Sequence, residues 1–202
     1  MEEESMIISC YGDSNTRYYL GDKQIDGPDT DSYPARLQAL FDKAGRTDVR
    51  VCNQGYPDMQ TDFGVEHFQE NVTGIAADVC ILGFGTNNVR QPDADLNRYL
   101  SEFEEMLRRC KAAGVRTAAL LIPWYAEAYC GLEGQKRIPV WNQALQELCA
   151  QYGTHVIDTY TPFAGDPDRF FNETETPKRH YSPAATAEIA KMAYTWLNGE
   201  EK

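Results

Sequence analysis

Apolar residues gather in five short runs along the 202-residue chain. Each run is almost continuously apolar rather than alternating with polar positions, which is typical of strands buried on both faces of a sheet. The predicted strands are Met6–Tyr11, Val49–Cys52, Val79–Phe84, Thr117–Ile122 and His155–Ile157.

Amphipathic segments lie between and after these runs. Their apolar residues recur at helical spacing, with Ser or Pro near several starts and Gly after several ends. The expected helices run from about Ser32 to Ala44, from about Asp93 to Ala113, from about Pro139 to Tyr152, and from Ser182 to Leu197.

The alternation of strands and helices with short connections predicts an α/β protein. A parallel sheet covered by helices on both faces forms a three-layer α/β/α sandwich. No repeat or low-complexity linker divides the chain, so we expect one domain over residues 1–202. Two longer connections, about 17–31 and 124–136, follow predicted strand ends. In open α/β sheets ligands bind at the carboxyl ends of the strands.

The net charge and the cysteine pattern indicate which ligands and partners the protein is not expected to bind. A formal net charge of -12 argues against binding to nucleic acid or anionic membranes. No run approaches the roughly 18 apolar residues of a membrane span, and the opening MEEES is acidic where a secretory signal is basic. Six cysteines show no C-x-x-C pair and no Cys/His cluster, which indicates neither a zinc site nor disulfides. We therefore expect no metal, reduced cysteines and a cytoplasmic protein.

Small residues and amides follow the predicted strands. In a parallel sheet these positions converge on one edge, with a serine early in the chain and a histidine late in it. Three blocks follow strands, namely Gly12-Asp13-Ser14-Asn15-Thr16, Asn53-Gln54-Gly55 and Gly83-Phe84-Gly85-Thr86-Asn87-Asn88. The fourth block, His180-Tyr181-Ser182-Pro183, lies just before the last expected helix.

In this order the four blocks resemble the SGNH hydrolases, the GDSL-type esterase and lipase family. The "GDSNT" block with the later Tyr33-Pro34 and Leu37 is similar to the small arylesterase and acetylesterase branch. "HYSPAATAEIA" resembles the tail of that branch, with Ala185 where Gly is usual. The resemblance covers nearly the whole chain and implies a flavodoxin-like sandwich with a five-stranded parallel sheet.

The resemblance also implies roles for four residues. Ser14 would attack an ester carbonyl and His180 would take its proton, because a hydroxyl is a poor nucleophile until a base removes the proton. The backbone N–H groups of Ser14 and Gly55 and the side-chain amide of Asn87 would bind the oxyanion of the tetrahedral intermediate. No cofactor is implied.

One position departs from the family pattern. The family usually carries Asp three residues before the histidine, and position 177 is Pro. Three readings stay open: a backbone carbonyl of Pro177 or Lys178 orients the imidazole, a carboxylate of Glu175 or Glu173 reaches in from elsewhere on the loop, or the protein is slow or inactive.

Each candidate also has a plainer interpretation. Ser14 alone is more often a helix cap, Gly55 alone a turn glycine, and Asn87 with Asn88 a turn pair. Gly83-x-Gly85 lacks the third glycine of a dinucleotide-binding loop. Histidines 67 and 155 are expected to be structural or exposed. Aromatic residues follow two of the predicted strands, and they either line a substrate pocket or pack over the sheet edge. These residues are Tyr18, Tyr19, Trp124, Tyr125 and Tyr129.

The sequence therefore predicts a serine esterase that cleaves small-molecule carboxylic esters through an acyl-Ser14 intermediate. Short acyl groups are favoured, on an aryl or acetylated carbohydrate ester, because no long apolar groove is evident. Two alternatives are a catalytically degenerate member that binds an acylated ligand and an interaction protein in which the blocks are only turns. The sequence leaves open the oligomeric state, a homo-oligomer included, and the balance between hydrolysis and acyl transfer.

Overall fold

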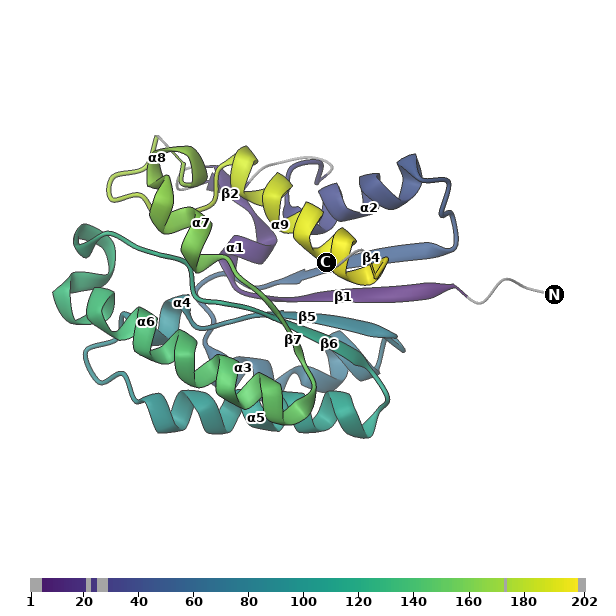
Figure 1. Ribbon diagram of the computed structural model, residues 1–202, viewed down its shortest axis with the longest axis horizontal. Coiled ribbons are helices and arrows are strands. Elements are labelled where there is room, and N and C mark those ends of the chain that lie inside the picture. Colours follow the sequence, from purple (N-terminus) through teal and green to yellow (C-terminus); the bar gives the residue numbers. More distant parts are fainter. Residues whose placement is uncertain (1–4, 21–22, 25–28, 173, 200–202) are drawn as a thin grey trace.

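Five parallel strands form the central sheet of the computed structural model, which describes residues 5–20, 23–24, 29–172 and 174–199 (Figure 1). The strands are β1 (Met6–Gly12), β4 (Val49–Gly55), β5 (Val79–Gly83), β6 (Arg116–Leu120) and β7 (His155–Ile157). All five predicted apolar runs are strands. Phe84, Leu121 and Ile122 lie just beyond the strand ends, where the chain leaves the sheet towards the next element.

The order of the strands across the sheet is β4-β1-β5-β6-β7. Counted along the chain this is the 2-1-3-4-5 order of flavodoxin-like sheets. The direction of winding reverses between β1 and β5, and such a switch point opens a crevice at the carboxyl ends of the strands. The residues that follow β1 and β5 therefore lie where this fold places its ligands.

Helices cover both faces of the sheet, as predicted. On one face α2 packs against α9, and on the other α3 and α6 pack against α5 (Figure 1). The bounds of these helices are α2 Tyr33–Lys43, α3 Thr61–Glu66, α5 Leu96–Ala112, α6 Glu127–Tyr152 and α9 Pro183–Leu197. The three-layer α/β/α sandwich is confirmed.

The connection expected over about 124–136 is mostly helical. Helix α6 begins at Glu127, and its axis breaks at Gly131, which has φ +71° and ψ 162°. Pro139 lies inside the helix rather than at its start. Proline is favoured at a first turn but tolerated in an interior when packing supports the helix. Here the turns before Pro139 pack on α4 (Thr86–Val89), where a Cβ on Gly134 would lie 3.4 Å from the carbonyl oxygen of Val89.

Several short elements were not predicted, because one or two turns carry no measurable periodicity. They are α1 (Ser14–Arg17), β2 (Tyr19–Leu20), β3 (Lys23–Gln24), η1 (Gln69–Thr73), α4 (Thr86–Val89), α7 (Tyr160–Gly165) and α8 (Pro167–Phe170). Strands β2 and β3 pair antiparallel apart from the main sheet. One residue separates α1 from the end of β1 and two residues separate α4 from the end of β5, so both short helices follow the strands of the switch point closely.

The centre of the sheet is fully buried. Ile8, Cys10, Ile81 and Leu82 have no exposed surface, which is why β1 and β5 read as continuous apolar runs. The Tyr11 ring meets Phe84 edge-on with centroids 5.0 Å apart. This packing fixes the ends of the two strands that carry the site.

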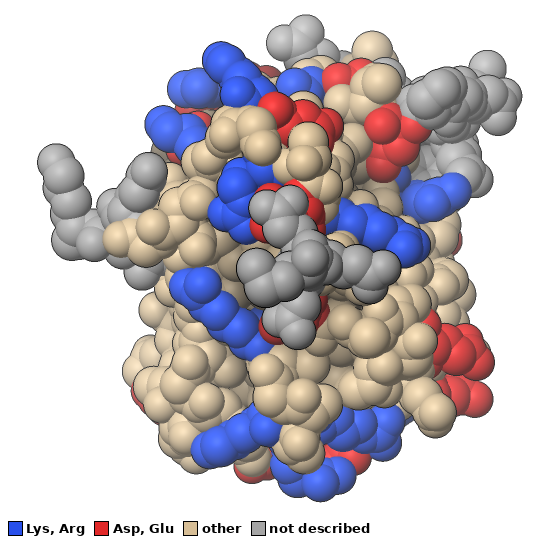
Figure 2. Space-filling view, turned by 90° about the vertical axis from the view of Figure 1, so that its right-hand side faces the viewer, with Lys and Arg blue, Asp and Glu red and all other residues tan. Residues whose placement is uncertain are grey.

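The opposite end of the sheet, where the strands begin, has an ordinary charged surface. Basic and acidic side chains are interspersed on this face (Figure 2). Ion pairs such as the partly exposed Arg46 with Asp48, 2.7 Å apart, occur among the charged groups of the chain. Such pairs contribute little to stability. Among the described helices, none combines the length and apolar character that a bilayer crossing requires.

Candidate active site

The turn after β1 presents Ser14 at the carboxyl edge of the sheet. A Cβ on Gly12 would lie 2.3 Å from Thr16 Oγ1 and 2.6 Å from the Gly83 carbonyl oxygen, so only glycine fits between β1, α1 and β5. The Asp13 carboxylate accepts a hydrogen bond from the backbone N–H of Asn15 (2.9 Å) and caps α1. Ser14 is the first residue of this helix, and the residue that caps the helix is Asp13. The interpretation of Ser14 as a helix cap is therefore wrong.

The structure brings Ser14 and His180 together from 166 positions apart. The imidazole Nε2 lies 3.2 Å from Ser14 Oγ. The loop that carries His180 is held by the N–H of Asn172, which donates to the His180 carbonyl oxygen (2.9 Å), and by Ser182, which caps α9 through its Oγ. A hydrogen bond at this distance is the contact that a general base needs with its nucleophile.

Glu175 orients the imidazole from five positions before it. Its Oε1 lies 2.6 Å from His180 Nδ1, and its Oε2 accepts hydrogen bonds from the backbone N–H groups of His180 (2.8 Å) and Arg179 (3.3 Å). The side chain is 3 % exposed. Of the readings left open by Pro177, the structure therefore supports a carboxylate from Glu175, while Glu173 lies outside the described residues.

Burial is the largest influence on His180. It lowers the pKa of the imidazole below its usual range, and the hydrogen bond and charge of Glu175 offset part of that shift. The ring is therefore neutral near pH 7 and able to accept a proton from Ser14.

We expect the pH profile of ester hydrolysis to report this lowered pKa. The kcat/KM for a simple ester should rise with pH through a midpoint below 6.5, the ordinary pKa of histidine, and stay level at neutral pH. Stopped assays between pH 4.5 and 8.5 would measure the profile. A midpoint above 7 would contradict the neutral, desolvated imidazole.

Asn15 links helix α1 to the loop that carries His180, a role that sequence reasoning missed. Its Nδ2 donates to the hydroxyl oxygen of Tyr125 (2.9 Å), and its Oδ1 accepts from the backbone N–H of Tyr181 (3.3 Å). Tyr125 is 1 % exposed, so it packs and positions rather than lining an open pocket. The presence of Asn15 inside the first block was the only signal in the sequence.

The other aromatic candidates differ in whether they pack in the core or are exposed enough to line a substrate pocket. Tyr18 is buried, whereas Trp124 and Tyr129 are partly buried against the core. The Arg90 guanidinium lies over the Tyr129 ring at 5.5 Å. The side chain of Tyr19 lies outside the described part of the structure. His67 lies against the Phe63 ring and His155 stacks on Trp196, as expected for structural residues.

Asn87 lies in α4, directly after β5, and is 2 % exposed. Its Nδ2 donates to the carbonyl oxygen of Met59 (3.0 Å), which leaves the second hydrogen of the same amide available. Gln91 donates to the Asn87 carbonyl oxygen (2.8 Å) and steadies the helix. Gly85 before it has φ +132°, a conformation that requires glycine.

Gly55 ends β4 beside α1. A Cβ there would lie 2.2 Å from the backbone nitrogen of Arg17, so the glycine allows α1 to pack directly on the strand end. Its N–H donates to Asn53 Oδ1 (3.1 Å), and Asn53 Nδ2 in turn donates to Asp29 (2.8 Å). The N–H expected to bind an oxyanion is thus engaged with a side chain in this structure.

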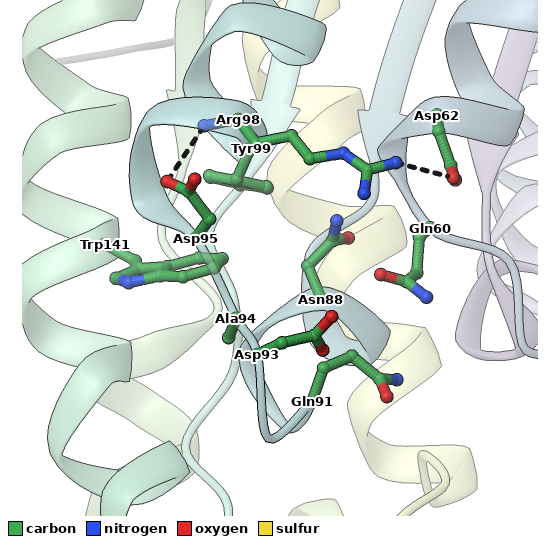
Figure 3. A pocket seen from close by; sticks show the side chains of 10 residues that line it. All are labelled: Gln60, Asp62, Asn88, Gln91, Asp93, Ala94, Asp95, Arg98, Tyr99 and Trp141. Atoms are coloured by element: carbon green, nitrogen blue, oxygen red, sulfur yellow. Dashed lines mark hydrogen bonds and ion pairs between the residues drawn. The ribbon is translucent and has the colours of Figure 1, made fainter.

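A polar cavity of about 250 Å³ lies behind the Asn87 helix (Figure 3). Asn88 and Gln91 contribute to its wall, but Ser14 and His180 do not line it. Its charged groups serve the local structure, because Arg98 pairs with Asp62 at 3.0 Å and Asp95 caps α5 (Figure 3). The hydrogen-bonded residues Ser14, His180 and Glu175 therefore lie outside this cavity.

Buried beside Ser14, the Asp13 carboxyl group is expected to lower stability at higher pH. Burial raises its pKa to about 7, although hydrogen bonds from Asn15 and Thr86 oppose the shift. Between about pH 4 and 7 the unfolded state has lost this proton and the folded state holds it, so the free energy of unfolding falls as pH rises.

Asp13→Asn removes this titration and keeps an oxygen for the cap. The stability of the wild type relative to this variant should therefore decline from pH 4 to pH 7, by up to about 4 kcal/mol, and then level off. Urea unfolding across this range is the measurement. A constant difference between the two proteins would contradict the raised pKa.

A serine whose hydroxyl meets a histidine, itself held by a buried carboxylate at the carboxyl edge of a parallel sheet, is the arrangement typical of serine hydrolases. Residues 10–187 match the GDSL-like Lipase/Acylhydrolase family, and the chain belongs to that family.

Solved structures with the same fold are acylhydrolases and esterases. A lipase/acylhydrolase from Enterococcus faecalis is 20 % identical, with a TM-score of 0.83 over 98 % of this chain and 97 % of that one. The acetylxylan esterase Axe2 from Geobacillus stearothermophilus is 18 % identical, with a TM-score of 0.76, and the match covers 100 % of this chain and 98 % of that one. The esterase EstA from Pseudoalteromonas is 16 % identical, with a TM-score of 0.72, and the match covers 96 % of this chain and 99 % of that one. No curated protein is significantly similar in sequence.

Proposed function

We propose that this protein is a serine esterase that cleaves short-chain carboxylic esters through an acyl-Ser14 intermediate. The observation that carries the proposal is the continuous hydrogen-bonded series from Ser14 Oγ to His180 Nε2 (3.2 Å) and from His180 Nδ1 to Glu175 Oε1 (2.6 Å). All three residues are less than 10 % exposed. Their burial strengthens the electrostatic interactions on which proton transfer depends.

In the proposed reaction Ser14 Oγ attacks the ester carbonyl carbon while its proton moves to His180 Nε2. The carbonyl oxygen becomes an oxyanion, and collapse of the intermediate expels the alcohol, which takes the proton from His180. Water then attacks the acyl-enzyme by the same proton route and releases the acid. Glu175 holds the ring by its Nδ1–H and stabilises the imidazolium that forms.

Two oxyanion donors fit the contacts. The backbone N–H of Ser14 has no hydrogen-bond partner among the described residues, and the Asn87 amide has one hydrogen left after its bond to Met59. Each such donor typically lowers the barrier by about 2.7–4 kcal/mol. A Gly55 donor, as expected from the sequence, would first require its bond to Asn53 to break.

We propose an acetylated carbohydrate or another acetyl ester as the substrate class. Two of the solved relatives with this fold are acetylxylan esterases, at 15 % and 18 % identity. The partly exposed Trp124 and Tyr129 beyond β6 are the type of side chain on which sugar rings and aryl groups stack.

The test uses a p-nitrophenyl alkylphosphonate, which traps an activated serine as a tetrahedral adduct. Intact-mass and peptide analysis should find one phosphonyl group on Ser14, and acetate release should be measured in parallel from p-nitrophenyl acetate and acetylated xylo-oligosaccharides. Phosphonylation without acetate release would support the serine site and reject acetyl esters. Failure of both would overturn the proposed function.

A further inference from the structure

Several side chains around the polar cavity behind α4 are already engaged with one another (Figure 3). Arg98 pairs with Asp62 at 3.0 Å, so its charge is balanced. The Asp95 carboxylate accepts hydrogen bonds from the backbone N–H groups that begin α5. The Asn88 side chain accepts from the N–H of Thr61 (3.3 Å) and donates to the Thr61 hydroxyl (2.8 Å). These side chains hold the walls of the cavity in place.

Other polar groups of the wall have donors or acceptors to spare. Within the described part of the chain, the side chains of Gln60 and Asp93 make no hydrogen bond and no ion pair. Gln91 donates through Nε2 to the Asn87 carbonyl oxygen (2.8 Å), which leaves its Oε1 without a partner among the same residues. Figure 3 shows all three side chains among those that surround the cavity. The cavity therefore offers amide and carboxylate groups to a ligand, but no unbalanced positive charge.

The size of the cavity and its apolar wall restrict the ligand further. Its volume of about 250 Å³ corresponds to about eight water molecules of ~30 Å³ each, and it is smaller than the roughly 300–1,000 Å³ typical of pockets for drug-sized ligands. On one side Trp141 stacks on Tyr99 with ring centroids 4.8 Å apart, and both residues are at most 3 % exposed. They form a rigid edge against which the C–H groups of one small ring can pack.

The charges of the lining disfavour ionic ligands. The unpaired Asp93 carboxylate would repel an anion, since Arg98 is already paired. One unpaired carboxylate provides too few ligands for a calcium ion, and no group of three or more His, Cys, Asp or Glu among the described residues is placed to hold a metal ion. A neutral sugar ring fits, because each hydroxyl both donates and accepts, an amide does the same, and a carboxylate accepts.

We propose that this cavity binds one neutral sugar ring through the side chains of Gln60, Asp93 and Gln91. The ring has two possible sources. It belongs either to the part of an ester substrate that is not cleaved, in which case the inference rests on the proposed function, or to a separate free saccharide. The experiments below distinguish the two.

The cavity adjoins the serine site through α4. The Met59 carbonyl oxygen accepts from the Asn87 side-chain amide (3.0 Å), and Gln60 is the next residue of the chain. Asn87 and Asn88 are neighbours on α4, and of the two only Asn88 lines the cavity. A saccharide chain with its acetyl ester at Ser14 would therefore cross α4 to place another ring in the cavity.

Binding is tested by NMR on ¹⁵N-labelled protein titrated with xylose, glucose and xylotriose at millimolar concentrations. At least one saccharide should shift the side-chain amide signals of Gln60 and Gln91 in a saturable manner. In Asp93→Ala the dissociation constant should rise about tenfold or more, the typical effect of losing a hydrogen bond to a charged acceptor. The control Asp42→Ala removes an exposed carboxylate of α2, on the opposite face of the sheet, and should leave the constant unchanged.

Two results of this titration would overturn the proposal. The first is the absence of a saturable shift with all three saccharides, which would mean that the cavity holds only water. The second is a shift produced by calcium chloride and by none of the saccharides, which would make the cavity a cation site. Equal weakening of saccharide binding in Asp93→Ala and Asp42→Ala would contradict the role of Asp93.

Kinetics distinguish the two sources of the ring. If the ring belongs to the substrate, Gln60→Ala and Asp93→Ala should raise KM for acetylated xylo-oligosaccharides at least tenfold more than KM for p-nitrophenyl acetate, which has no sugar ring. If NMR detects saccharide binding and the two KM values change alike, the ligand is a free saccharide and the proposal stands. Saccharide binding by a protein that releases no acetate from either ester and is not phosphonylated at Ser14 would overturn the proposed function and leave this inference standing.

Discussion

Replacing Ser14 by alanine is expected to lower kcat for p-nitrophenyl acetate by roughly 10⁶-fold, to the background rate, because removal of the nucleophile ends covalent catalysis. The fold should persist, since the substitution removes one oxygen from a side chain that is 8 % exposed. Initial rates of p-nitrophenol release, with stability followed by thermal unfolding, provide the measurement.

The matched control for this variant is Ser9→Ala. Ser9 is a fully buried serine of β1, the strand that precedes Ser14, and its hydroxyl donates to the Asn71 carbonyl oxygen (2.7 Å). Its loss should reduce stability by about 1 kcal/mol or more and leave kcat unchanged. Undiminished activity in Ser14→Ala would mean that Ser14 is only a turn residue and that the proposed mechanism is wrong.

Replacing Glu175 by glutamine is expected to lower kcat by about 10⁴-fold with little change in KM. The amide can no longer hold the Nδ1–H tautomer of His180 or stabilise the imidazolium, and loss of this function in serine proteases has an effect of that size. The two backbone N–H groups that donate to Glu175 can donate equally to the amide oxygen of glutamine, so the loop should keep its shape.

Two readouts distinguish this role from a structural one. The low-field resonance of the His180 Nδ1 proton should disappear in Glu175→Gln, and the pH profile should move to lower pH because Glu175 raises the pKa of His180. Lys178→Met, in the same loop, loses only an exposed pair with Asp168 and should keep full activity. A Glu175→Gln variant within tenfold of the wild type would show that another group orients the ring.

Much of the fold was predictable because the sheet is buried on both faces. Continuous apolar runs such as those around Ile8 and Ile81 are the direct consequence of that burial. The part of α6 before Pro139 was missed for a local reason, since Gly131 breaks the helix axis and Pro139 is a residue favoured at helix starts, while the turns between them are held by packing on α4. Helices of one or two turns, such as α4, are set by their tertiary contacts rather than by any periodicity.

The sequence by itself determined the layered α/β fold, because continuous apolar runs alternate with amphipathic segments, and the resemblance of its four blocks to a known family predicted the approach of Ser14 to His180. The tertiary structure alone decided which carboxylate holds the imidazole, since the reach of Glu175 depends on how the loop before His180 folds back. It also decided that the Gly55 N–H is engaged by Asn53 and that Asp58 has a positive φ. Hydrogen-bond competition and backbone conformation arise only when the chain is packed, so no spacing of residues could reveal them.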